Sequence, residues 1–150
     1  MHIRLALAGK DRTVLKQLGQ ICSAHDDFEI VARSVTGRRA LQKIALSRPD
    51  VVVLDMRLKK PDAVTVLRQM RDTLGIRTII LDDSDSDAVH AAICIGVHCV
   101  MLIDKVPILL AKGIRDVHAG GKWFERDYAM GVLERLLAPK KKSNAYGATV

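Results

Sequence analysis

Short apolar runs alternate with longer amphipathic segments along most of the chain. Five runs rich in Val, Ile, Leu and Ala cover residues 3–8, 28–35, 51–54, 78–81 and 99–103. They recur roughly every 25 residues, which is the interval typical of βα units in a parallel sheet. The pattern therefore predicts an α/β fold with five strands.

The segments between these runs carry the start and stop signals of helices. Asp11 is placed to cap a helix over residues 12–24, and Thr36 to cap a second helix that ends before Pro49. Both segments have apolar residues at the 3,4 spacing of a buried stripe. Three further helices are predicted over residues 62–73, from the acidic residues 84–87 to Gly96, and from Val106 to Gly120.

Beyond the fifth helix, the chain changes character twice. We expect residues 1–121 to form one domain and residues 122–138 to form a connecting sixth helix. Within that segment, Asp127 is placed to act as a helix cap. Residues 139–150 are polar and begin with a proline and three lysines, which is typical of a linker. We expect a further domain, absent from this chain, to follow the linker.

Composition narrows the class of protein. With 49% hydrophobic and 27% charged residues, the 150-residue chain is predicted to fold as one globular domain. Aromatic residues make up only 3%, which argues against the base-stacking surfaces of RNA-binding modules. No apolar stretch approaches the roughly 20 residues that span a bilayer, and no leader sequence is visible, so we expect a cytoplasmic protein. The net charge of +7 is a weak indication of nucleic-acid binding.

Cysteine, histidine and acidic residues give no sign of a metal or cofactor site. The cysteines are odd in number, lack CxxC spacing and are interpreted as reduced apolar residues: Cys22, Cys94 and Cys99. Four aspartates lack the glycine turn and terminal Glu of a calcium loop and are interpreted as acids at a helix start: Asp82, Asp83, Asp85 and Asp87. No nucleophile, base and acid occur in a catalytic pattern, so an enzyme is not predicted.

The candidate functional residue is Asp55, which directly follows the buried third run. Ligands and reactive groups of open parallel sheets collect at the carboxyl ends of the strands. A carboxylate at that edge needs a cationic or hydrogen-bonding partner, because burying an unpaired charge is costly. Asp55 is therefore expected at the mouth of the sheet with such a partner.

Residues 49–62, around Asp55, resemble the segment that carries the phosphorylated aspartate of response-regulator receiver domains. Residues 3–8, 78–81 and 104–107 fall at the spacing of the same family. The resemblance implies a flavodoxin-like, doubly wound (βα)5 sheet with strand order 2-1-3-4-5. The sixth helix is similar to the connector that leads to a helix-turn-helix domain in NarL/FixJ (LuxR-type) regulators.

The chain departs from this family at the positions that support phosphorylation. Gly9 and Lys10 stand where the family has the acidic pair that holds Mg²⁺. Asp82 replaces a Ser or Thr, and Ile103 replaces the lysine that binds a phosphoryl oxygen. Val100 replaces the switch aromatic. The resemblance therefore implies a degenerate site in which only Asp55 is kept, without a cofactor and with doubtful Mg²⁺ binding.

Two arrangements of charge around Asp55 follow from these substitutions. The ammonium of Lys10 is placed to neutralise Asp55 or Asp82 as a fixed internal ion pair, worth several kcal/mol of Coulomb energy at an effective dielectric near 20 before desolvation. Alternatively, Asp11 and Lys105 act as displaced versions of the acidic pair and the lysine, and Asp55 is still phosphorylated.

The sequence thus predicts an atypical receiver that regulates transcription by protein contact. A homodimer is expected, with a histidine kinase or another regulatory protein as a possible partner and with DNA bound only through the absent output domain. The alternatives are a phosphorylated receiver and a stand-alone interaction module. In a dimer, basic residues are expected to meet acidic ones across the interface, namely Lys112, Arg115 and Arg135 with Asp83, Asp85 and Asp87.

Overall fold

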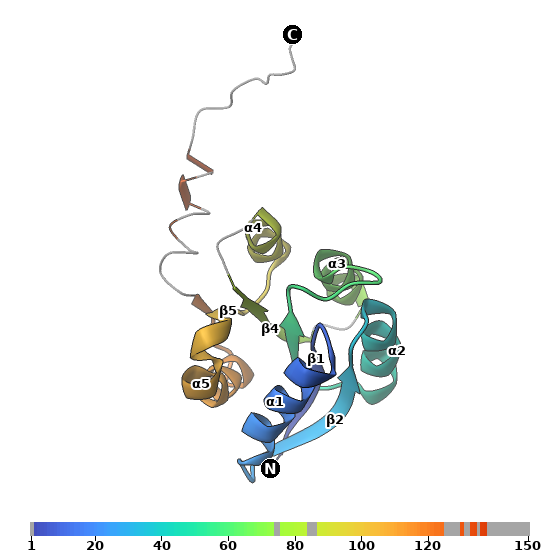
Figure 1. Cartoon of the computed structure of the whole chain (residues 1–150). Helices are drawn as coiled ribbons and strands as arrows, with labels where there is room; N and C mark the ends of the chain where they lie inside the picture. The colour runs from blue at the N-terminus through green and yellow to red at the C-terminus, as the bar shows by residue number, and fades with distance from the viewer. Residues whose placement is uncertain are drawn as a thin grey trace.

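The structure is a parallel sheet with helices on both faces (Figure 1). The computed structural model describes residues 2–73, 76–83, 87–124, 130, 133, 134, 136 and 137. The strands are β1 (Ile3–Ala8), β2 (Phe28–Ser34), β3 (Val51–Asp55), β4 (Arg77–Asp82), β5 (Cys99–Leu102) and β6 (Trp123–Phe124). The helices are α1 (Arg12–Ser23), α2 (Gly37–Ser47), α3 (Ala63–Thr73), α4 (Asp87–Ile95), the 3-10 turn η1 (Ile103–Lys105) and α5 (Val106–His118).

The strand order is β2-β1-β3-β4-β5-β6, and each neighbouring pair is parallel. The predicted flavodoxin-like order 2-1-3-4-5 is confirmed. The sequence pattern missed β6, because two residues are too short a run to stand out. Gly120, with a φ of 99°, turns the chain back after α5, and the Trp123 N–H then donates to the carbonyl of His98 at 2.8 Å.

The helix starts follow the predicted caps. The side chain of Asp11 accepts the N–H of Val14 at 2.9 Å, and that of Thr36 accepts the N–H of Arg39 at 3.2 Å. These bonds satisfy N–H groups that have no partner within their own helix. α4 begins at Asp87, whereas Ser84 and Asp85 lie outside the described residues.

Each face of the sheet buries its own hydrophobic cluster. Side chains of α2, α3 and α4 cover one face, among them Ile44, Leu67 and Val89. α1 and α5 cover the other face with Leu18 and Leu110 among their buried residues. Because strands of such a sheet are buried on both sides, β3 consists entirely of buried residues, and its last residue is Asp55.

The C-terminal predictions fall mostly outside the described residues. Residues 130, 133, 134, 136 and 137 are helical, as predicted for the sixth helix, but its predicted start at residue 122 is wrong, because Trp123 and Phe124 form β6 and pair with β5. The other residues of 125–138, the linker 139–150 and the domain boundaries stay predictions. No helix in the described part of the chain is long and apolar enough to cross a membrane.

One expectation about the cysteines is wrong. Cys22 and Cys99 are buried free thiols, but Cys94 on α4 is exposed rather than in apolar surroundings. It lies on the outward side of a short amphipathic helix. Burial raises the pKa of the Cys22 thiol to about 11. Cys22 is therefore a neutral apolar side chain at ordinary pH.

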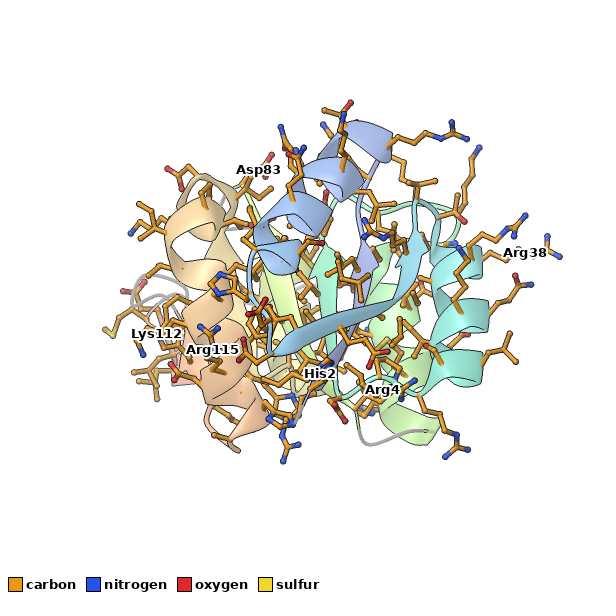
Figure 2. All side chains as sticks on the ribbon, turned by 90° about the horizontal axis from the view of Figure 1, so that it is seen from below. His2, Arg4, Arg38, Asp83, Lys112 and Arg115 are labelled. Atoms are coloured by element: carbon orange, nitrogen blue, oxygen red, sulfur yellow. The ribbon has the colours of Figure 1, made fainter. Side chains whose placement is uncertain are left out.

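The basic residues of α5 form ion pairs within the chain (Figure 2). Arg115 donates to both carboxylate oxygens of Asp27, from Nε at 2.9 Å and from Nη2 at 2.8 Å, and its guanidinium lies 4.8 Å from the Phe28 ring centroid. Lys112 pairs with Asp116 at 2.7 Å. Within the chain, Lys112 and Arg115 thus already pair with Asp116 and Asp27, and the expectation that they meet acids across a dimer stays a prediction. Arg135 lies outside the described residues.

Candidate functional site

The candidate site lies where β1, β3, β4 and β5 end at the same edge of the sheet. Residue pairing brings Asp55 of β3 beside Leu81 of β4, and the Met56 N–H donates to the Leu81 carbonyl at 2.9 Å. Lys10 follows β1, Asp82 ends β4, and Ile103 follows β5. This shared edge places side chains from four separate chain segments around Asp55, as expected for an open parallel sheet.

The carboxylate of Asp55 is fully buried and accepts four N–H groups. Oδ1 accepts the backbone N–H of Arg57 at 2.9 Å and its Nε–H at 3.0 Å. Oδ2 accepts the Nη2–H of Arg57 at 3.0 Å and the backbone N–H of Lys10 at 3.1 Å. Both oxygens are thus held, and the charge is neutralised by a guanidinium in the bidentate geometry that arginine favours.

Arg57 is the functional residue that sequence reasoning missed. Its side chain is 28% exposed and lies over a carboxylate that is 0% exposed. The side-chain hydrogen bonds to Asp55 raise the pKa of Arg57 above its usual range, and the charges of Asp55, Asp83 and Asp11 act in the same direction. The available signal was the spacing Asp55-x-Arg57 directly after a buried strand.

The predicted ion pair of Lys10 is wrong. Lys10 is exposed, and it reaches Asp55 through its backbone N–H rather than through its ammonium. Across the described residues, its ammonium pairs with neither Asp55 nor Asp82. The physical reason is that Arg57, two residues from Asp55 on the same loop, already occupies the carboxylate.

The loop that carries Arg57 is fastened to the start of α2. The backbone N–H groups of Gly37 and Arg38 donate to the carbonyls of Lys59 and Lys60, both at 2.8 Å. Gly37 allows this approach, because a Cβ at that position would collide with the backbone carbonyl oxygen of Pro61. The first turn of α2 therefore sets the path of the loop between β3 and α3.

The other positions singled out by sequence lie on different sides of the sheet. Asp82 is buried at the end of β4, with 4% of its surface exposed. Ile103 is half-buried and packs with the cluster beneath α1 and α5, whereas Val100 is buried in the cluster of the opposite face. Of these three residues, Ile103 lines the cavity that Arg57 also lines.

The residues around Asp55 do not fit a magnesium ion. Mg²⁺ requires oxygen ligands in octahedral geometry, but both oxygens of Asp55 accept N–H groups and Gly9 has no side chain. Asp11, the nearest alternative acid in sequence, is used as the cap of α1. In the described part of the chain, no three His, Cys, Asp or Glu side chains are grouped to hold a metal.

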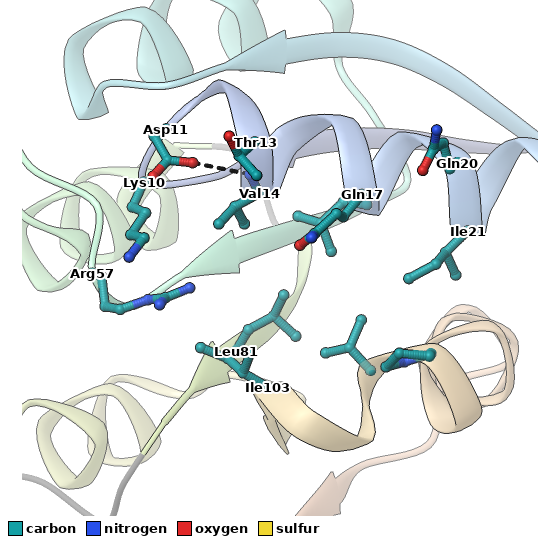
Figure 3. A pocket seen from close by; sticks show the side chains of 13 residues that line it. Lys10, Asp11, Thr13, Val14, Gln17, Gln20, Ile21, Arg57, Leu81 and Ile103 are labelled. Carbon is teal, nitrogen blue, oxygen red and sulfur yellow. Dashed lines mark hydrogen bonds between the residues drawn. The ribbon is translucent and has the colours of Figure 1, made fainter.

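Two cavities open beside the Asp55–Arg57 pair. The larger, of about 660 Å³, lies between α1 and α5 and is shown in Figure 3. Lys10 and Arg57 lie at one of its ends, Ile21 lies at the other, and Leu81 and Ile103 line it from the sheet side. The second, of about 480 Å³, is lined by Lys10, Arg57 and Lys59. The cavities share two cationic residues and thus meet at the mouth of the site.

Comparisons with known proteins find similarity to regulatory proteins. No protein-family model matches it. The transcriptional regulatory protein DesR of Bacillus subtilis is 29% identical over 135 residues, which cover 89% of this chain and 65% of DesR. A LuxR-family two-component response regulator from Aurantimonas has a TM-score of 0.80 at 20% identity, with 92% of this chain and 100% of that chain covered.

Enzymes also match, over a short stretch. A protein-glutamate methylesterase/protein-glutamine glutaminase of Nocardioides is 35% identical over 71 residues, which are 47% of this chain and 19% of that protein. The chain therefore spans at most 65% of the length of these two curated relatives.

Proposed function

We propose that this chain, whose homologues are response regulators and whose fold is that of their receiver domains, works without phosphorylation of Asp55. It is the regulatory half of a transcription regulator and acts by protein contact. The single observation that carries this proposal is the bidentate pair between Arg57 and the buried carboxylate of Asp55.

The Asp55–Arg57 pair opposes phosphoryl transfer at the acceptor itself. An acceptor carboxylate must offer a free oxygen to the incoming phosphorus, and bound metal ions and cations must stabilise the charge of the phosphoryl oxygens. Here each oxygen of Asp55 already accepts two N–H groups. To free one of them, the guanidinium would have to leave a carboxylate with no exposure to water, which is costly.

The neighbouring residues support the same conclusion. Asp82 brings a second carboxylate to the edge where a phosphoryl group would lie, and like charges repel. Ile103 supplies methyl groups rather than a cation. At these two positions, an incoming phosphate would thus meet one added negative charge and one fewer positive charge than in a receiver with the complete set of residues.

Without phosphorylation, the domain needs another way to change or hold its state. A two-state protein responds only to a ligand that binds one state more tightly than the other. We therefore propose that a protein partner or a second copy of this chain selects the active state. DNA binding belongs to an output domain beyond this chain, in keeping with the shorter span of the chain relative to DesR.

Self-association is tested by sedimentation of the purified chain at micromolar concentration, with and without about 0.5 M salt to screen surface charge. A dimer at both salt concentrations is expected, because Lys112 and Arg115 of α5 already pair with acids within the chain. A monomer under all conditions would leave a partner protein as the selecting ligand and would remove the homodimer.

The proposal about Asp55 is tested with beryllofluoride, which mimics an acyl-phosphate on aspartate. Amide resonances of Lys10, Asp55 and Arg57 are followed by two-dimensional NMR in the presence of Mg²⁺. We expect these resonances not to move. Saturable shifts that Asp55→Asn abolishes would show that the acceptor site is open.

A further inference from the structure

The cavity between α1 and α5 has the size and lining of a ligand site. Its volume of about 660 Å³ lies in the range of roughly 300 to 1,000 Å³ that small-molecule sites occupy. Its walls carry aliphatic side chains from two helices and the sheet, among them Val14, Ile21, Leu81 and Ile103. Displacing water from an apolar cleft of this kind with an apolar group is favourable.

One end of this cavity carries positive charge. Figure 3 shows Lys10 and Arg57 together at the end nearest the sheet edge, and Lys59 joins them around the adjoining smaller cavity. In the described part of the chain, no carboxylate pairs with the ammonium of Lys10 or Lys59. Asp11 lies at the same rim, but its side chain accepts the Val14 N–H as the cap of α1.

The cavity is cationic at one end and apolar along its walls, and this indicates the kind of ligand that it binds. We infer that the cavity binds a small amphipathic anion, with its acidic head at Lys10 and its aliphatic body between α1 and α5. The head would accept hydrogen bonds from an ammonium that pairs with no carboxylate among the described residues, and such charge-assisted bonds are stronger than neutral ones. The body would cover Val14, Ile21 and Ile103. Ile103 supports this assignment, because a lysine there would bring a charge into the apolar wall.

Such a ligand would act on the Asp55–Arg57 pair. Its head shares the cavity end with Arg57, whose side chain is 28% exposed and whose guanidinium holds Asp55. A second anion there would compete for the guanidinium and loosen the loop after β3. This inference rests on the proposed function in one respect, since it supplies a non-phosphate input for a receiver that is not phosphorylated.

The probe is decanoate, titrated below its micelle concentration into the whole chain and followed by calorimetry and by amide NMR shifts. We expect saturable binding with shifts at Lys10, Val14 and Ile103. Lys10→Met should weaken it about tenfold, the cost of one charge-assisted hydrogen bond. Lys16→Met, at an exposed position of α1, should leave the affinity unchanged.

The apolar end is tested by Ile21→Glu, which places a negative charge where the aliphatic chain would lie. Ile21 is half-buried, so the variant should fold, and its urea denaturation checks this. Leu46→Glu is the control, because Leu46 is an 86% exposed residue on α2, away from the cavity. Binding should be lost in Ile21→Glu and kept in Leu46→Glu.

Other outcomes would overturn the inference. If decanol bound as tightly as decanoate, the cationic end would contribute nothing to binding. If inorganic phosphate bound as tightly as decanoate, the apolar walls would contribute nothing. Equal loss in Leu46→Glu, or no binding, would remove the site. Self-association that Ile21→Glu abolishes, without decanoate binding, would assign the cavity to a second copy. If decanoate does not bind and Asp55 is also not phosphorylated, the ligand site is wrong but the proposed function still stands.

Discussion

At the scale of single residues, the stability of the site depends on two opposing energies at Asp55, namely the cost of desolvating its charge and the gain from pairing it with Arg57. At an effective dielectric near 20, opposite charges about 3 Å apart attract by about 5 kcal/mol, and most of this is offset by the cost of removing the two ions from water. The net gain of the pair is therefore small, but the cost of removing one partner is large. Asp55 and Arg57 are consequently a coupled unit.

Replacing Arg57 tests this coupling. Arg57→Met leaves Asp55 with only the backbone donors of Lys10 and Arg57, and we expect a loss of about 2 to 3 kcal/mol in the free energy of unfolding at pH 7, below the value for a fully buried pair because Arg57 is partly exposed. Urea denaturation measures it. Arg39→Met, at an exposed position of α2, should stay within about 0.5 kcal/mol of the parent.

A double-mutant cycle separates the pair from other effects. Asp55→Asn with Arg57→Met should cost clearly less than the sum of the two single substitutions, because the second change removes the charge that the first left unpaired. Additive losses, or a single Arg57→Met loss no greater than that of Arg39→Met, would contradict the ion pair as the organising contact of the site.

At the scale of elements, Arg115 ties α5 to the loop before β2. Its hydrogen bonds lower the pKa of Asp27 from 3.8 to about 2. A carboxyl whose pKa is lowered by folding adds stability that is fully present above its unfolded value and is lost as the pH falls through its folded value. The contribution of this contact should therefore fade between pH 3.8 and about 2.

Comparing the parent chain with Asp27→Asn checks this dependence. At pH 7 the variant should unfold at a lower urea concentration, since the charge on Asp27 is gone. As the pH is lowered below 4, the two midpoints should approach each other, because the parent protonates the same carboxyl. A difference that stays constant over the acid range would mean that Asp27 acts through packing and not through its charge.

The contact between α2 and the loop after β3 can be tested in the same way. Gly37→Ala puts a methyl group against the carbonyl of Pro61, and such overpacking typically costs about 1 to 3 kcal/mol. Gly113→Ala in α5 is the control, because its methyl group would come closest to the flexible end of Met101, at 3.0 Å, and to no backbone atom. The control should be neutral or stabilising, since alanine favours helix over glycine by about 0.5 to 1 kcal/mol. Similar effects of both would mean that the loop moves freely away from α2.

The elements show which parts of the structure a sequence can predict. Periodicity and caps were sufficient for α1 and α2, since Asp11 and Thr36 make the expected local bonds. β6 was not predictable, because its pairing depends on the edge of β5 rather than on its own two residues. The hydrogen bond from the Gly37 N–H to the Lys59 carbonyl could not be predicted either, because no sequence motif indicates it.

At the scale of the whole molecule, the repeat of apolar runs predicted the parallel sheet, and hence the position of Asp55 at its carboxyl edge, whereas the strand order came from the resemblance to receiver domains. The partner of Asp55 was predicted wrongly. Lys10 and Arg57 both lie near the carboxylate, and only the path of the loop after β3 decides which side chain reaches it. The sequence alone does not show whether Lys10 or Arg57 pairs with Asp55, because this depends on the three-dimensional path of the loop.

The most direct test of the account is phosphoryl transfer from acetyl phosphate to the whole chain, in the presence of Mg²⁺, measured by intact mass. A receiver domain with the complete set of acceptor residues serves as the positive control. We predict that the mass of this chain does not change while the control gains a phosphoryl group, because Arg57 holds both oxygens of Asp55. A Mg²⁺-dependent gain of one phosphoryl group that disappears in Asp55→Asn would contradict the account.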